Sequence, residues 1–167
     1  MKKLKYLEHY PKNIVLQIAK LIEDKKLDKY LLSKYKTSHE YKSDKALYEY
    51  TIDIKNQFLK KSLPLSKVLY DGKINVINDA LGLHTFISRV QGGKLKSKNE
   101  IRIGTLFKNV PEEFLRMIVI HELAHLKEKQ HNKSFYKLCT FMESNYHQYE
   151  FDLRVYLTYI DIYGKLY

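Results

Sequence analysis

The feature that most constrains this chain is a helical stretch, residues 114–126, whose side chains are apolar on nearly every side. A helix with this pattern is buried in a core and does not lie on the surface. Three polar residues, His121, Glu122 and His125, nevertheless lie near its end in the order His-Glu-Leu-Ala-His. Burying such groups costs free energy unless they are paired or coordinate a metal. The stretch therefore predicts a buried helix that carries a functional site.

The spacing of these three residues is typical of a metal site. Side chains four residues apart lie one above the other on a helix, so His121 and His125 can reach the same ion. Each imidazole nitrogen would lie about 2.0–2.1 Å from a zinc ion. Glu122, beside the first ligand, can then take a proton from a water at that ion. We predict two metal ligands and a catalytic base; a structural His–Glu pair is the alternative.

A third histidine follows the motif after five residues. Residues 127–130 are all polar, which predicts that the helix ends there and that the chain bends back toward the metal. We predict His131 as the third ligand, with Glu143 and Glu150 as alternatives from a later helix. Three protein ligands leave one position open, as is typical of a catalytic zinc. Zn²⁺ is therefore the predicted cofactor.

Composition excludes several classes of protein. A single cysteine, Cys139, excludes an internal disulfide framework and a cysteine-rich zinc site. The longest apolar run near the motif, residues 117–120, is far too short to span a membrane. No apolar segment follows the basic residues at the start of the chain, so a signal peptide is not predicted. We expect a cytoplasmic protein with no membrane contact.

The chain is strongly basic, with 30 basic and 19 acidic residues and a net charge of +11. Such an excess can indicate an anionic ligand, either a nucleotide or a nucleic acid. The lysines are spread along the chain, however, in short clusters at 25–26, 60–61 and 94–98. This dispersion favours a lysine-rich solvated exterior, with an anionic ligand as the alternative.

The order of the expected elements indicates an α+β fold. Helices are expected at 13–23, from a cap at Ser43 or Asp44 to about residue 60, from a cap at Asn109 through the motif, and from about 132. Another apolar, aromatic segment runs over 151–162. A hairpin is expected at 66–77 around Asp71-Gly72, and strands at 85–91 and 100–107. We predict one domain, residues 1–167. It has a helical segment at 1–62 and a core at 63–167, in which a small, mostly antiparallel sheet packs on helices beside the motif helix.

The residues around the motif resemble a known family. The stretch Val119–Leu126, together with residues 131–136 (His-Asn-Lys-Ser-Phe-Tyr), is similar to the YgjP-like group of metal-dependent hydrolases, also called DUF45 or M48-like metallopeptidases. The resemblance is specific over about residues 85 to 137. It implies a minimal zincin-like fold, with three histidine ligands and a glutamate base at the positions named above.

Four functions compete on these residues. The leading hypothesis is a zinc metallopeptidase that cleaves a peptide or protein substrate with water activated by Glu122. The first alternative is a metal-dependent nucleotide phosphohydrolase, because an activated water attacks phosphorus as well as a carbonyl. The others are a nucleic-acid-associated protease or binding protein, with its lysines gathered on one face, and a scaffold with a structural zinc. His147, Tyr149 and Arg89 are candidates for stabilising transition-state charge.

Overall fold

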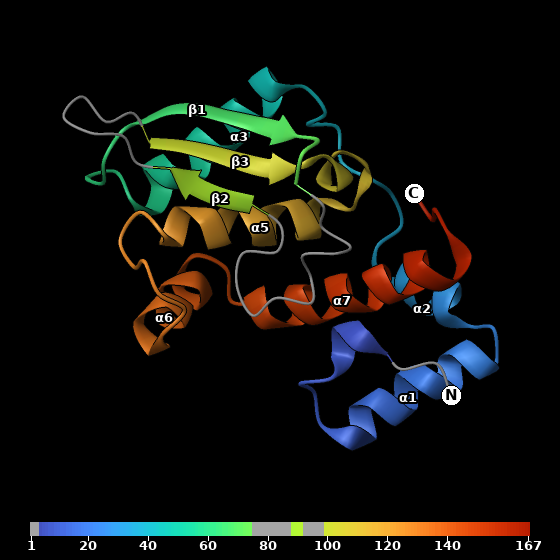
Figure 1. Ribbon diagram of the computed structural model, residues 1–167. Helices are drawn as coiled ribbons and strands as arrows, with labels where there is room; N and C mark the ends of the chain where they lie inside the picture. The colour runs from blue at the N-terminus through green and yellow to red at the C-terminus, as the bar shows by residue number, and fades with distance from the viewer. Residues whose placement is uncertain (1–3, 75–87, 92–98) are drawn as a thin grey trace.

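The computed structural model describes residues 4–74, 88–91 and 99–167, and shows helices gathered around a small sheet (Figure 1). The helices and 3-10 turns are η1 (Lys5–Leu7), α1 (Lys12–Glu23), α2 (Leu27–Lys34), α3 (Asp44–Phe58), η2 (Thr105–Asn109), α5 (Glu112–Ala124), α6 (Lys133–Met142) and α7 (Tyr146–Tyr163). The strands are β1 (Leu65–Asp71), β2 (Ser88–Gln91) and β3 (Asn99–Gly104). Helices dominate and accompany one small sheet, so the α+β prediction holds.

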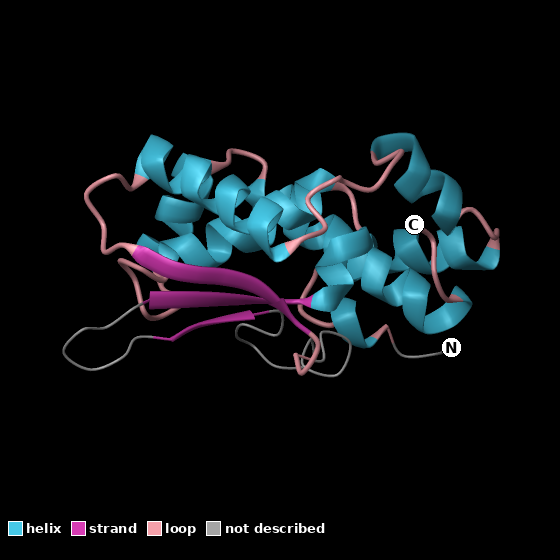
Figure 2. Ribbon diagram, turned by 90° about the horizontal axis from the view of Figure 1, so that it is seen from above, coloured by secondary structure: helices cyan, strands magenta, loops and turns pink. Residues whose placement is uncertain are grey.

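The sheet has the order β1-β3-β2 within the described residues. The central strand β3 pairs with β1 in parallel, so that Val68 lies beside Ile101, and with β2 in antiparallel fashion. The described helices lie to one side of the sheet in Figure 2, where α3 packs on β1 and α5 packs on β2 and β3. Ile101 and Ile103 are fully buried in this layer.

The prediction of a mostly antiparallel sheet is wrong. The Asp71-Gly72 turn is present, because Asp71 Oδ1 accepts a hydrogen bond of 2.9 Å from the Lys73 amide. The strand beside β1 is nevertheless β3, some thirty residues further on and parallel to it. A tight turn fixes only a local change of direction. Which strands pair is decided by the burial of their apolar side chains in the core. Residues 75–77 of the expected hairpin lie outside the described residues.

Helix boundaries follow the local chemistry in most places. Ser43 caps α3 as predicted, since its side chain accepts a 3.0 Å hydrogen bond from the Ala46 amide. Asn109 does not cap α5; Pro111 occupies that position, and Asn109 Oδ1 accepts from Lys42 Nζ instead. The predicted strand at 100–107 ends at Gly104, and η2 begins at Thr105.

A buried carboxylate joins the first helices to the last one. Asp152 on α7 has no exposed surface and accepts hydrogen bonds from the hydroxyls of Tyr30 and Tyr35. Lys34 Nζ donates to the same side chain over 2.6 Å, and Gln148 donates over 3.0 Å. Four donors therefore satisfy one carboxylate in the core. Without α2 most of these donors would be missing, and burying the carboxylate would cost free energy.

His39 holds the segment before α3 against η2 and the residue that follows it. Its Nε2–H donates to the backbone carbonyl of Phe107 over 2.6 Å, and its Nδ1 accepts from the Tyr41 amide over 2.9 Å. The His39 amide also donates to the Val110 carbonyl. Both ring nitrogens have fixed roles that only the neutral imidazole can fill. Burial accordingly lowers the pKa of His39.

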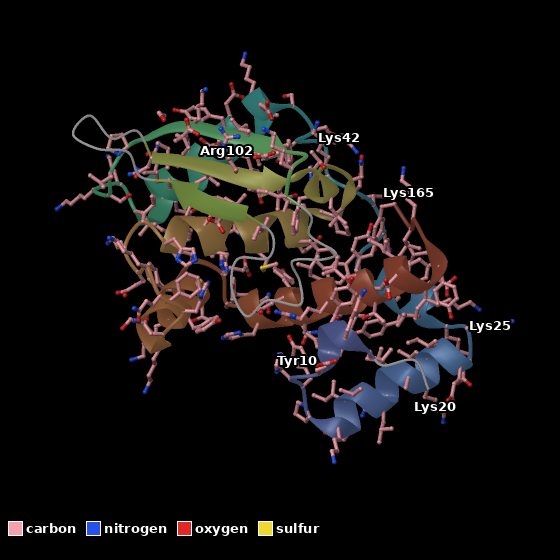
Figure 3. All side chains as sticks on the ribbon, in the orientation of Figure 1. Tyr10, Lys20, Lys25, Lys42, Arg102 and Lys165 are labelled. Carbon is pink, nitrogen blue, oxygen red and sulfur yellow. The ribbon has the colours of Figure 1, made fainter. Side chains whose placement is uncertain are left out.

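The basic side chains labelled in Figure 3 do not point one way: Lys20 and Lys25 lie in and just after α1, whereas Lys42 and Lys165 come from other segments and point in other directions. For these residues the distribution fits a solvated exterior. No helix among the described residues combines the length and the apolar character that crossing a membrane requires.

Candidate metal centre

The motif lies at the end of the most buried helix. Two glutamates in the first turn, Glu112 and Glu113, suit the positive end of the α5 dipole. All side chains from Met117 to Ala124 are then buried, because the sheet covers one side of α5 while α6 and α7 cover others. His121 is 7% exposed and Glu122 is 0% exposed. The polar motif therefore begins in a fully buried part of the core.

The chain turns back immediately after α5. His125 is the C-cap residue, and its Nδ1–H donates to the backbone carbonyl of Glu128 over 2.9 Å. The next helix begins where Asn132 accepts from the Phe135 amide. His131 lies directly before this cap. Positive φ values occur only at Lys25 and Gly164 within the described parts of the chain, so the turn needs no glycine.

The three histidine side chains converge on one point. The Nε2 atoms of His121 and His125 are 3.3 Å apart, and each is 3.1 Å from Nε2 of His131. Phe135 supports all three rings, with centroid separations of 4.9, 4.6 and 4.8 Å from His121, His125 and His131. Within the described residues, this is the group of potential ligands close enough to hold a metal ion.

The triangle of nitrogens fits a metal ion and not a set of hydrogen bonds. A neutral imidazole nitrogen carries either a proton or a lone pair, so three converging nitrogens cannot all be satisfied by one another. The carbonyl that faces Nδ1 of His125 fixes the proton there and leaves a lone pair on Nε2. Two nitrogens about 2.05 Å from one tetrahedral ion would be about 3.3 Å apart, close to the observed separations. The family and this triad together indicate a metal ion.

Electrostatics favour the neutral, ligating form of these histidines. Burial lowers the pKa of His121 well below 6.5, and the neighbouring His125 and His131 lower it further. Burial also lowers the pKa of His125, partly offset by hydrogen bonds to backbone groups of Glu128 and Lys129. A lowered pKa keeps the lone pairs free for a cation at neutral pH.

Stability of the metal-free protein is expected to fall as the pH drops below about 6.5. The unfolded chain then binds protons that the buried, neutral His39 and His121 do not bind, so the unfolding constant rises by up to about tenfold per pH unit for each such group. Urea unfolding in chelator between about pH 7 and pH 5 measures this slope. His39→Gln should flatten it, whereas the same change at the exposed His9 should not. A pH-independent unfolding constant would contradict the expectation.

Glu122 lies against the triad. Its Oε1 is 4.0 Å from Nε2 of His121, and the carboxylate is completely buried. Glu143 and Glu150, the alternative ligands, are held elsewhere. The first forms a 2.6 Å ion pair with Arg116, and the second lies 3.6 Å from Arg154. Neither belongs to the group of potential metal ligands.

Among the three candidates for stabilising charge, His147 is connected to the triad through the ring of Tyr136. Its ring is 5.6 Å from that of Tyr136, which is 6.5 Å from His131. Tyr149 packs against Tyr35 instead. Arg89 is part of β2, but its side chain lies outside the described residues. The neighbour that the sequence did not single out is Tyr146, whose hydroxyl is 2.8 Å from Nδ1 of His121.

A buried helix with three converging histidines and an adjacent glutamate is the arrangement of a metal-binding site. The sequence model described as YgjP-like, metallopeptidase domain, matches residues 28–156, and the chain belongs to this family. A protein of Escherichia coli (strain K12) named UTP pyrophosphatase is 56% identical over 162 residues, which cover 97% of this chain and 97% of that protein. No solved structure was found to match the chain.

These comparisons confirm the family and correct the predicted activity. The family resemblance, expected over about residues 85 to 137, extends over residues 28–156. The prediction of a metallopeptidase with a peptide substrate is wrong, because the relative that spans nearly the whole chain is named for action on a nucleotide. The motif could not make this distinction, since the same activated water attacks carbon or phosphorus. The family and the relative agree on a hydrolase.

Proposed function

We propose that this chain is a metal-dependent nucleotide phosphohydrolase that converts UTP and water to UMP and pyrophosphate. The observation that carries the proposal is the 56% identity to UTP pyrophosphatase along 97% of both chains. The positive net charge of +11 supports it, because a basic protein attracts a polyanionic substrate and raises its encounter rate.

In this proposal His121, His125 and His131 hold a zinc ion through their Nε2 atoms. Separations of 3.1 and 3.3 Å between these atoms support a small tetrahedral ion, and a set of three imidazoles suits zinc. Only three protein ligands leave a position open for chemistry. When bound, such an ion supplies a Lewis acid that lowers the pKa of water and offsets charge on a phosphoryl oxygen.

Glu122 acts as the general base in this proposal. Its carboxylate, 4.0 Å from Nε2 of His121, is close enough to the ligand cluster to take a proton from the attacking water. The water oxygen forms a bond to the α-phosphorus, and the bond from that phosphorus to the bridging oxygen breaks. Pyrophosphate leaves with the electron pair, and Glu122 releases the proton. The buried position of Glu122 keeps it beside the reacting atoms.

Incubation of the purified protein with UTP is expected to release UMP and pyrophosphate in equal amounts. A strong chelator should abolish the release, and added zinc should restore it, because the three histidines cannot activate water without an ion. Ion-exchange chromatography separates the nucleotide products, and a coupled assay measures pyrophosphate. An unstructured protein such as casein serves as the control and should remain intact. Products of UDP and phosphate, or a rate that ignores the chelator, would overturn the proposal.

A further inference from the structure

The buried ring of Tyr146 lies directly behind the first histidine of the triad. Tyr146 is the first residue of α7 and has no exposed surface. Its hydroxyl is 2.8 Å from Nδ1 of His121, and the two ring planes are inclined by only 17°. The opposite nitrogen of His121, Nε2, faces the other two histidines. One imidazole therefore connects the candidate ion to a phenol from another helix.

Such a contact decides which nitrogen of His121 carries the proton. The ring can offer a lone pair at Nε2 only when the proton of the neutral imidazole is on Nδ1. For His125 the matter is settled by the Glu128 carbonyl, which can only accept. A hydroxyl can either donate or accept. The tautomer of His121 therefore depends on whether the Tyr146 hydroxyl donates to Nδ1 or accepts from it.

The ligand role of His121 settles the direction of this contact. A ring that offers the lone pair of Nε2 to an ion carries its proton on Nδ1. The Tyr146 oxygen, 2.8 Å from Nδ1, is then the acceptor of that N–H.

We infer that Tyr146 is a positioning residue for the metal centre: its hydroxyl accepts the Nδ1–H of His121 and keeps Nε2 available to the ion. The inference rests on the proposed metal centre but not on the choice of nucleotide. Partners behind metal-ligating histidines are most often carboxylates or carbonyls, and their removal typically weakens metal binding 10- to 100-fold, about the range expected here. Within this fold, a neutral phenol takes that role for the most buried ligand.

Replacing Tyr146 by Phe tests the inference without changing the size of the ring. The variant should bind zinc about 10- to 100-fold more weakly than the parent chain in competition with a chelating dye. The matched control is Tyr70→Phe, because Tyr70 is also buried and its hydroxyl donates to the Tyr41 carbonyl over 2.6 Å. Both changes remove one buried hydrogen bond and should lower stability. Only the change at Tyr146 should weaken zinc binding, and equal affinities in the two variants would overturn the inference.

The tautomer of His121 is a second and independent readout. In metal-free protein labelled with ¹⁵N, two-bond correlations of the imidazole nitrogens should show the proton on Nδ1 in the parent chain. The Phe variant should show a mixture of tautomers. A proton on Nε2 in the parent would overturn the inference. A parent chain with the proton on Nδ1 but without affinity for zinc would instead overturn the metal centre, so the two failures are distinguishable.

Discussion

Glu122→Gln is expected to lower the turnover of UTP by about 10²- to 10⁴-fold, the usual contribution of a general base. The amide has nearly the shape of the carboxylate but cannot accept a proton at neutral pH. The three histidines are unchanged, so the zinc content of the purified variant should equal that of the parent. Initial rates of pyrophosphate release and metal analysis by mass spectrometry measure the two quantities.

The same substitution at Glu49, which is exposed on α3, controls for the change in charge. This variant should turn over UTP at the parental rate. If Glu122→Gln retained the parental rate while keeping its zinc, Glu122 would not be the base. If it lost its zinc, the carboxylate would instead be needed to hold the metal centre together.

His131→Ala is expected to weaken zinc binding by on the order of 10²- to 10³-fold and to remove activity at ordinary zinc concentrations. One of three nitrogens is lost from a set whose members lie 3.1 to 3.3 Å apart, and the two remaining ligands on α5 cannot enclose an ion. Competition with a chelating dye gives the affinity, and thermal unfolding with and without zinc shows whether the ion still stabilises the fold.

His147→Ala is the matched control for this experiment. His147 is exposed on α7 and lies within ring-contact distance of Tyr136, but it is not among the potential ligands. Its loss should leave the zinc affinity unchanged. Full zinc occupancy in His131→Ala, with a loss in His147→Ala, would move the third ligand to α7.

Local features of this molecule could be read from the sequence, and long-range ones could not. The four-residue spacing of His121 and His125 and the polar residues that follow were enough to anticipate how the imidazoles meet, because both are properties of one short segment. The pairing of β1 with β3 was missed because it joins segments about thirty residues apart and depends on how the whole core packs. Tyr146 has no sequence signal of its own, since 15 tyrosines share the same patterns.

The prediction of a peptide substrate was wrong for a chemical reason. A metal site specifies how a water is activated, whereas the bond that breaks depends on what binds beside the site. The basic composition did point to an anionic ligand, but lysines spread over the surface give the same total charge. The relative named UTP pyrophosphatase, 56% identical along 97% of the chain, favours the anionic ligand.

The carboxylate of Asp152 also sets a limit on how this protein can be shortened. Hydrogen bonds from Tyr30, Lys34 and Tyr35 reach it from the first third of the chain, while Gln148 is its donor from α7 itself. A fragment that began at the sheet would bury this charge with most of its donors missing, which costs several kcal/mol, on the order of the whole stability of a small domain. A shortened version of this protein therefore has to keep α2 and Tyr35.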